Sequence, residues 1–242
     1  MNILYCGNDK TEDGLLISIL SLLKNSKENL HIYLLTMHLR VGTKVYFPIS
    51  QTFADYADRL VKQAGPDNFV VLIDGTKLFY KDLPVKNLDT RFTPYCMLRL
   101  FADEIPQLPE KLLYLDNDVV CRKNFSEFYH QDISEYEFAG VLDYYGRWFF
   151  RRNIWHFDYQ NSGVLLMNLR KIRETGLLYR CRKLCIEKKM FMPDQSALNK
   201  LAAFKKASPR RFNEQRRLRN DTVLQHFTTS FRFFPLVSYS ES

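Results

Sequence analysis

Short apolar runs alternate with amphipathic segments along the chain, a rhythm that predicts strands alternating with helices. Six runs have the length and composition of strands: 2–7, 30–37, 69–74, 112–116, 138–143 and 162–168. Three segments between them have helical spacing: 14–25, 51–65 and 93–105. The first helix is apolar on nearly every side, which predicts burial, and the second is amphipathic and closed by Gly65. The pattern predicts an α/β fold whose mainly parallel sheet carries helices on both faces.

The length of 242 residues suits one large α/β domain, and no repeat or low-complexity stretch divides it. After residue 170 the chain becomes helical and basic, and it ends in an aromatic segment, HFTTSFRFFP. We therefore predict a single domain, residues 1–242, with a short C-terminal extension.

Composition and charge narrow the choice of partners. Hydrophobic residues make up 46% of the chain, which is typical of a globular protein. The net charge of +8 favours anionic partners such as nucleotide phosphates, nucleic acid or a membrane surface. The arginine-rich run 208–221 is typical of a solvated, partly paired face, and without a recognised binding module we expect no nucleic-acid partner.

The cellular compartment is predicted from segments that the sequence lacks. It has no apolar run of membrane-spanning length, and its start lacks the layout of a signal peptide. The five cysteines are odd in number and form no C-x-x-C pair, which is typical of reduced thiols. We therefore expect a cytoplasmic protein, with peripheral contact at the inner face of the membrane left open.

The stretch LLYLDNDVVC, residues 112–121, places two aspartates directly after an apolar strand. Ligands of open parallel sheets sit beyond the carboxyl ends of the strands, where Asp116 and Asp118 fall. Residues two apart in an extended chain point the same way, so the two carboxylates would repel each other unless a cation neutralised them. A D-x-D pair also arises by chance, and a solvated strand end is the alternative.

Four blocks of the sequence resemble glycosyltransferase family 8, the retaining group with a GT-A fold that includes glycogenin and bacterial lipooligosaccharide galactosyltransferases. The blocks, in the family's order, are NILYCGND, RLFADEIPQLPEKLLYLDNDVV, YQNSGVLLMNLRKIR with MPDQSALN, and HFTTSFRFFP. The resemblance implies a nucleotide-binding part at about 1–120, a sugar and acceptor part at about 121–225 and a C-terminal lid at about 226–242.

The resemblance also implies a ligand set. Family members bind a nucleotide sugar, usually UDP-linked, through a divalent cation, Mn²⁺ or alternatively Mg²⁺, and the matching ligands are Asp116, Asp118 and His226. Positions matching the donor pocket are Cys6, Gly7, Asn8, Arg99, Asn117, Asn161, Ser162 and Arg232. The catalytic positions are Asp194, which would hold sugar hydroxyls, and Gln195, which would lie near the reacting carbon. Asp143 matches a position on the acceptor side, followed by the aromatic and basic segment 144–157.

Some of these positions depart from the family pattern or have plainer explanations. Thr11 stands where relatives carry a tyrosine that stacks on uracil, Thr229 replaces a glycine after the histidine, and Arg232 replaces a lysine. His226 could be a lone histidine near a strand end, and Arg99 a surface residue paired with Asp103 four positions on. The segment PDQSALNK is also an ordinary helix start.

The resemblance implies a metal-dependent retaining glycosyltransferase. It would move a hexose, galactose or glucose, from a UDP-sugar to a glycan, glycolipid or glycoprotein. Two alternatives stay open. One is a haloacid-dehalogenase-type phosphatase that uses the D-x-D loop, although no later acidic pair such as GDxxxD follows it. The other is a non-catalytic nucleotide-sugar-binding protein.

Overall fold

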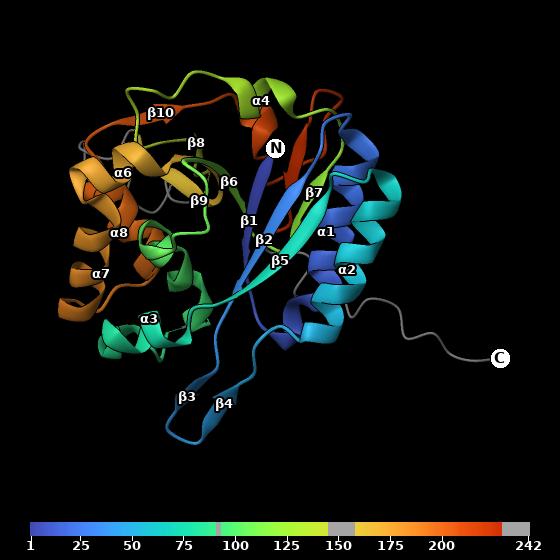
Figure 1. The fold of residues 1–242 in the computed structure, drawn as a ribbon. Helices are drawn as coiled ribbons and strands as arrows, with labels where there is room; N and C mark the ends of the chain where they lie inside the picture. Colours follow the sequence, from blue (N-terminus) through green and yellow to red (C-terminus); the bar gives the residue numbers. More distant parts are fainter. Residues whose placement is uncertain (91–92, 145–157, 229–242) are drawn as a thin grey trace.

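A seven-stranded sheet forms the centre of the protein (Figure 1). The structure is a computed structural model that describes residues 1–90, 93–144 and 158–228. Its strands are β1 (Asn2–Cys6), β2 (His31–Thr36), β5 (Phe69–Asp74), β6 (Lys111–Leu115), β8 (Phe138–Leu142), β9 (Gln160–Asn168) and β10 (Lys205–Ala207). They lie in the order β10-β8-β9-β6-β1-β2-β5.

Within this sheet β9 alone runs against its neighbours. It pairs antiparallel with both β6 and β8, whereas the β1–β2, β1–β6, β2–β5 and β8–β10 pairs are parallel. The prediction of an α/β fold with a mainly parallel sheet is therefore confirmed. Every residue of β9 is buried, so its apolar run looks like that of a parallel strand and does not show its direction.

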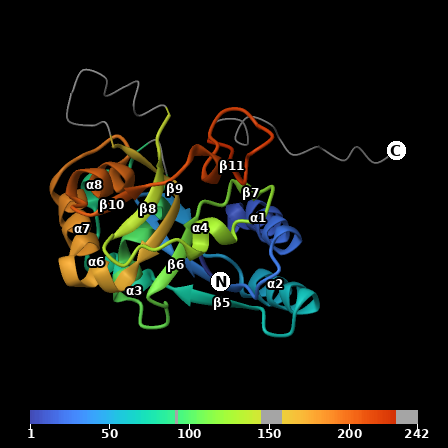
Figure 2. The same cartoon turned by 90° about the horizontal axis from the view of Figure 1, so that it is seen from above.

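Helices cover both faces of the sheet (Figures 1 and 2). On one face lie α1 (Glu12–Asn25), α2 (Gln51–Ala64) and α4 (Ser126–His130). On the other lie α3 (Thr76–Lys81), α6 (Leu169–Thr175), α7 (Leu177–Glu187), α8 (Pro193–Leu201) and a long 3₁₀ helix, η3 (Pro94–Glu104). The alternation along β1 feeds both cores, because Ile3 and Tyr5 pack with α1 whereas Leu4 and Cys6 face the η3 side.

The predicted elements differ from the observed ones in detail. The segment predicted as an ordinary helix over 93–105 is the 3₁₀ helix η3, and α1 is not buried all round, since Leu20 is exposed. All five cysteines are free thiols. Within the described ranges no helix is long and apolar enough to cross a membrane.

Two short antiparallel pairs were not predicted. The hairpin of β3 (Leu39–Val41) and β4 (Lys44–Tyr46) projects beyond the carboxyl end of β2 (Figure 1). The other pair joins β7 (Val119–Cys121) to β11 (Leu224–His226), two segments about a hundred positions apart in the chain. A strand of three residues is too short to show the alternating pattern by which a strand is recognised in a sequence.

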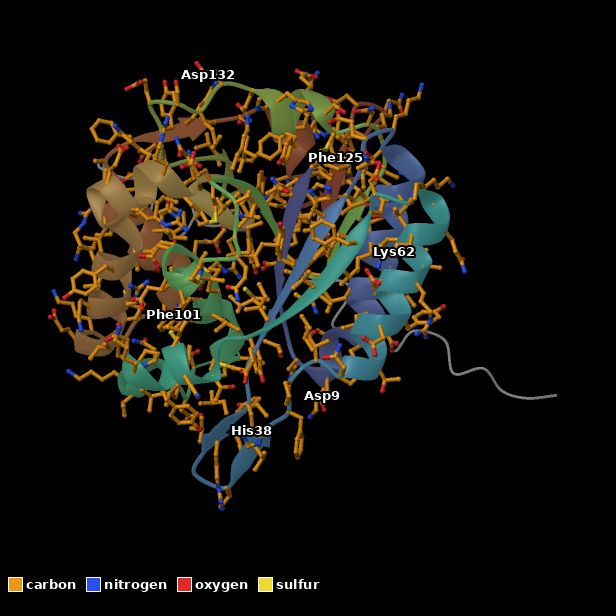
Figure 3. All side chains as sticks on the ribbon, in the orientation of Figure 1. Asp9, His38, Lys62, Phe101, Phe125 and Asp132 are labelled. Atoms are coloured by element: carbon orange, nitrogen blue, oxygen red, sulfur yellow. The ribbon has the colours of Figure 1, made fainter. Side chains whose placement is uncertain are left out.

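The two ends of the sheet differ in what surrounds them. Asp9 and His38 follow β1 and β2 and lie together at the hairpin end, whereas Asp132 lies at the opposite end (Figure 3). The carboxyl ends of the parallel strands therefore meet on the side where the D-x-D pair stands, as expected for a ligand site in this type of sheet.

Candidate active site

Two carboxylates and an imidazole converge just beyond the carboxyl end of β6. Asp116 follows the last residue of β6, and its backbone N–H donates to the carbonyl of Gly163 on β9 at 2.8 Å. His226 pairs with Val119 across the β7–β11 ladder, and this pairing places its ring beside both aspartates. His226 Nε2 lies 3.1 Å from Asp118 Oδ1 and 3.6 Å from Asp116 Oδ2. We call these three residues the Asp–Asp–His cluster.

The charges within the Asp–Asp–His cluster shift the pKa values of its members. The exposed fractions of the side chains are 26% for Asp116, 12% for Asp118 and 5% for His226. Burial would raise the pKa of Asp116, but the charges of Arg99 and His226 hold it below its usual value. Burial would lower the pKa of His226, but the carboxylates of Asp118 and Asp116 raise it. The two carboxylates therefore favour the protonated form of the imidazole.

The donor atoms of the cluster fit a divalent cation. One ligand atom from each residue can be chosen so that all three lie within 4.8 Å of one another. Asp118 Oδ1 is buried, and apart from the His226 imidazole 3.1 Å away it has no hydrogen-bond donor among the described residues, so it has unused capacity to bind a cation. Two carboxylate oxygens and an imidazole nitrogen form a mixed set that suits Mn²⁺ better than Mg²⁺.

Arg99 orients the first ligand of the cluster. Its guanidinium donates to Asp116 Oδ1 at 2.8 Å, to the carbonyl of Ser162 and to the carbonyl of Cys96. Tyr114 donates to the same carboxylate oxygen at 2.6 Å, and its ring lies under the guanidinium at 4.0 Å. Asp116 Oδ1 is thus saturated with donors, and Oδ2 is left facing His226.

These contacts decide against a surface role for Arg99. The residue is only 3% exposed, and the proposed partner Asp103 instead forms an ion pair with Arg182. Asp194 also approaches Arg99, with 3.4 Å between Asp194 Oδ2 and Arg99 Nε.

The predicted catalytic pair lies next to β9 on the first turn of α8. Asp194 accepts from the Ser162 hydroxyl at 3.1 Å, and Gln195 Oε1 accepts from the Ser162 backbone N–H at 3.0 Å. Burial raises the pKa of Asp194, and Arg99 opposes this shift. Both residues are 4% exposed, so α8 packs them against β9 and does not leave them at a solvated helix start.

Asn161 and Asp143 extend the same hydrogen-bond network away from the Asp–Asp–His cluster. Asp143 Oδ2 accepts from Gln195 Nε2 at 2.8 Å and from Asn161 Nδ2 at 3.2 Å. The structure therefore brings Asp116, Asp118, His226, Arg99, Asn161, Ser162, Asp194 and Gln195 into one connected region, whereas their roles remain proposals.

Thr11 holds the turn after β1 that contains the predicted N-terminal pocket residues. Its hydroxyl accepts from the backbone N–H of Asn8 at 3.0 Å and donates to the Asn8 carbonyl at 2.7 Å. A Cβ at Gly7 would collide with that hydroxyl, so the turn after β1 closes tightly there. Cys6 and Asn8 are buried at the end of β1. Thr11 thus caps the turn, at the position where relatives place a stacking ring.

The remaining predicted positions lie at the edges of the site or outside the described residues. Asn117 sits in the loop between β6 and β7, close enough to α1 that a Cβ at Gly14 would stand 2.8 Å from its carbonyl oxygen. Arg232 and Thr229 fall outside the described residues. Of the aromatic segment 144–157, the structure describes Tyr144, which is half exposed and lies 4.2 Å from the Arg216 guanidinium.

Two residues that contact the site were not predicted from the sequence. Tyr114 looks like any apolar member of a buried strand, and only its offset of two from Asp116 places it on the same side. Asn213 lies within the run 208–221, which was predicted to be a solvated face, yet it is 1% exposed and bonded to His226. The arginines of that run do form ion pairs, for example Arg211 with Glu127, so the prediction holds for them and is wrong for Asn213.

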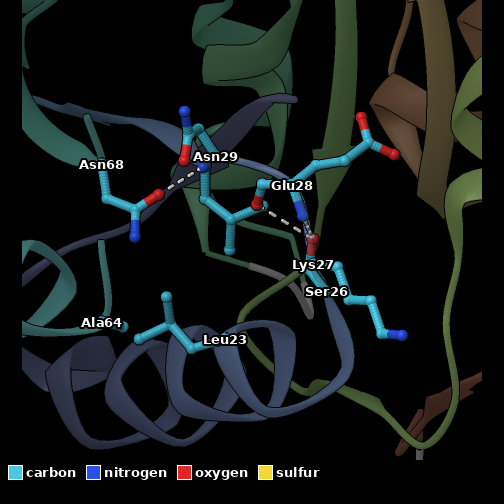
Figure 4. A pocket seen from close by; sticks show the side chains of 8 residues that line it. Leu23, Ser26, Lys27, Glu28, Asn29, Ala64 and Asn68 are labelled. Atoms are coloured by element: carbon cyan, nitrogen blue, oxygen red, sulfur yellow. Dashed lines mark hydrogen bonds between the residues drawn. The ribbon is translucent and has the colours of Figure 1, made fainter. Parts of the chain in front are cut away.

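A separate cavity of about 170 Å³ lies at the other end of the sheet, before β2 (Figure 4). Its lining includes Lys27, Glu28 and Asn68, and Asn68 accepts from the Leu30 N–H at 2.7 Å. No group of three or more metal-binding side chains lines it, so it lacks the chemistry of the Asp–Asp–His cluster.

Comparison with known proteins supports the resemblance over almost the whole chain. The sequence profile of glycosyl transferase family 8 matches residues 2–228. The glycosyltransferase GlyA of Streptococcus pneumoniae is 28% identical over 152 residues, which cover 61% of this chain and 21% of that protein. The lipopolysaccharide 1,2-glucosyltransferase of Escherichia coli is 26% identical over 255 residues, covering 94% of this chain and 71% of that protein. The chain thus spans only a fifth of the length of GlyA.

Solved structures show the same fold. An active-site mutant of LgtC superposes with a TM-score of 0.71 at 18% identity, covering 95% of this chain and 88% of that one. The galactosyltransferase LgtC in complex with donor and acceptor sugar analogs gives a TM-score of 0.67 over the same shares. These neighbours share the fold of this chain, and the family profile covers every described residue of the site. The chain therefore belongs to glycosyl transferase family 8.

Proposed function

We propose that this protein transfers a hexose, galactose or glucose, from a UDP-sugar to a hydroxyl of a glycan or glycoconjugate, with a divalent cation and with retention of anomeric configuration. The observation that carries the proposal is the Asp–Asp–His cluster, with its unsatisfied Asp118 oxygen, at the carboxyl end of the parallel strands. The names of two relatives, a lipopolysaccharide glucosyltransferase and the galactosyltransferase LgtC, support a hexose donor and a glycan acceptor.

Asp116, Asp118 and His226 would hold the cation, Mn²⁺ or Mg²⁺. When bound, it would neutralise the donor's diphosphate and so stabilise the departing UDP. Arg99 and Tyr114 would keep Asp116 Oδ2 aimed at the site, because both donate to the other oxygen. We assign Arg99 this positioning role, since three of its N–H groups are already bonded within the protein.

Gln195 and Asp194 would shape the sugar side. Gln195 is held at both ends, with Oε1 accepting from Ser162 and Nε2 donating to Asp143, so its oxygen is a weak nucleophile. These contacts favour attack on the same face as the leaving group. The acceptor oxygen bonds to the anomeric carbon as the bond from that carbon to the phosphate oxygen breaks, and the acceptor's proton passes to the departing phosphate. Asp194 would accept hydrogen bonds from sugar hydroxyls.

The division of the chain follows from these roles. We propose that residues up to about 120 bind the nucleotide, that those from 121 to about 225 bind sugar and acceptor, and that the stretch from 226 onward covers the diphosphate with Arg232. The phosphatase alternative is not favoured, because the D-x-D loop is linked to His226 and the family 8 profile covers both. A silent binding protein is not favoured, because the whole predicted metal and sugar-side set is present.

A donor screen tests the proposed function. Purified protein is incubated with a panel of nucleotide sugars and Mn²⁺, and release of free nucleotide is measured with and without EDTA. We expect release from UDP-galactose or UDP-glucose that EDTA abolishes. Gln131→Ala, on a side chain that bonds at the Asp132 end of the sheet, serves as a matched variant that should leave release unchanged. Release that is insensitive to EDTA would contradict the proposal.

A further inference from the structure

We infer that Asn213 is a positioning residue that fixes the ring of His226 with its proton on Nδ1 and leaves Nε2 free to bind a cation. Asn213 lies just after η4 (Arg210–Phe212), is 1% exposed, and matches none of the blocks that carry the family resemblance. Its Oδ1 lies 3.2 Å from His226 Nδ1, and its Nδ2 donates to Asn161 Oδ1 at 3.0 Å. Which of its two amide atoms faces the histidine is set by Asn161.

The orientation of Asn161 is fixed at both ends by partners with one possible role each. Its Oδ1 accepts from the backbone N–H of Gly163 at 3.0 Å, and a backbone N–H can only donate. Its Nδ2 lies 3.2 Å from Asp143 Oδ2, and an ionised carboxylate can only accept. Turning the amide over would place oxygen against carboxylate and NH₂ against N–H.

The orientation of Asn213 follows from that of Asn161. Because Asn161 presents its oxygen, Asn213 must turn its NH₂ toward Asn161 and its own oxygen toward His226. The Asn213 oxygen can only accept, so this contact favours a proton on His226 Nδ1, whereas the carboxylates of Asp116 and Asp118 favour a proton on Nε2 while no cation is bound. A neutral imidazole has one N–H, so a cation that takes the place of the proton at Nε2 leaves that N–H on Nδ1, where Asn213 accepts it.

The same chain of hydrogen bonds continues to the sugar side. Asp143 Oδ2 accepts from both Asn161 and Gln195, so the orientation of the metal-facing histidine and that of the proposed catalytic amide share one carboxylate. A ligating histidine whose other nitrogen donates to a fixed acceptor has its tautomer and ring angle set in advance. The tautomer and its consequence for cation binding both rest on the cation site of the proposed function.

Nitrogen NMR tests the tautomer on the protein saturated with Mg²⁺, a diamagnetic cation. Histidine labelled with ¹⁵N is recorded at alkaline pH, where the imidazole is neutral, and the His226 signals are identified by their loss in His226→Gln. We expect the Nδ1–H form in the wild type and a mixture or the Nε2–H form in Asn213→Ala. An Nε2–H form in the wild type would overturn the inference. This result does not depend on any activity, so failure of the proposed function would be seen separately as absent Mn²⁺ binding by the wild type.

Calorimetric titration with Mn²⁺ tests the consequence. Asn213→Ala should weaken Mn²⁺ binding by about 10–100-fold, the usual effect of losing an outer contact to a metal-binding histidine. Asn213→Asp keeps an acceptor for Nδ1–H but loses the donor to Asn161 Oδ1, so it should recover part of the affinity. Asn68→Ala removes another buried asparagine, 5% exposed, at the far end of the sheet, where it bonds Leu30 and Val61, and should leave Mn²⁺ binding unchanged.

Three outcomes of the titration would overturn the inference. They are wild-type affinity in Asn213→Ala, equal losses in Asn213→Ala and Asn68→Ala, and failure of Asn213→Asp to improve on alanine. Thermal melting of each variant shows whether it is folded, and the NMR tautomer of Asn213→Asp gives a second reading that a loss of stability would not change.

Discussion

Gly163 has no side chain at the point where β9 passes the Asp–Asp–His cluster, and alanine there should displace His226. A Cβ at this position would lie 2.7 Å from Asp116 Oδ2 and 2.8 Å from His226 Nδ1, and closer still to His226 Cε1. Ordinary contacts of a carbon atom are about 3.5 Å or longer, so the carboxylate would have to retreat by roughly 0.8 Å and the imidazole, whose Cε1 would stand closest to the new atom, by roughly 1.4 Å. Neither side chain can move by this much without breaking hydrogen bonds, because Arg99 and Tyr114 bond Asp116 and Asn213 bonds His226.

This displacement is large for a metal site, in which ligand distances are held within about 0.2 Å. We therefore expect Gly163→Ala to weaken Mn²⁺ binding by at least about 10–100-fold, as loss of an outer contact would. Overpacking of the core should also lower the free energy of unfolding by about 1–3 kcal/mol. Calorimetry measures the first quantity and urea denaturation the second.

A matched glycine on the neighbouring strand separates the two effects. A Cβ at Gly140 would lie 2.6 Å from Gln160 Oε1 and 3.0 Å from Leu165 Cδ2, with no contact to the Asp–Asp–His cluster. Gly140→Ala should lose stability and keep its Mn²⁺ affinity. Wild-type Mn²⁺ affinity in Gly163→Ala, or an equal loss in both variants, would refute the geometric reasoning.

Further predictions concern stability, the orientation of the cluster and the base. Arg182→Met should lower the free energy of unfolding by about 3 kcal/mol, because it leaves buried carboxylates without their partner. Lys44→Met breaks an exposed ion pair and should cost less than about 1 kcal/mol in the same urea titration, and equal costs would contradict the difference in burial. Arg99→Lys should weaken Mn²⁺ binding in calorimetry, because an ammonium cannot bond Asp116 and two carbonyls in one plane, and unchanged binding would remove its positioning role. With Mn²⁺ present, UDP should bind more tightly than GDP or ADP even though Thr11 offers no ring, and equal binding would refute the uridine assignment.

The sequence allowed the parallel half of the fold to be predicted because its strands are continuous apolar runs separated by amphipathic helices. The location of Asp116 and Asp118 followed from one of those runs, since a strand's carboxyl end is where a ligand meets such a sheet. His226 came only from the family resemblance, because the strand that places it has three residues and pairs with a segment about a hundred positions away.

Other features depend on tertiary contacts that leave no local pattern. The direction of β9 is set by its partners β6 and β8, and a buried strand has the same apolar composition whichever way it runs. Asn213 was missed because five arginines dominate the composition of its segment, although the chain buries the amides of Asn213 and Gln215 there. Single buried polar residues of this kind are recognised by their hydrogen-bond partners, which a sequence does not show.

The central claim, that Asp116, Asp118 and His226 bind a divalent cation for donor binding, is tested most directly by titrating Mn²⁺ into the UDP-bound protein. We predict saturable Mn²⁺ binding to the wild type. In Asp118→Asn the Mn²⁺ affinity should fall by more than the roughly 10–100-fold expected for loss of an outer contact, while the melting profile stays unchanged. Equal Mn²⁺ binding by the folded Asp118→Asn variant and the wild type would contradict the account.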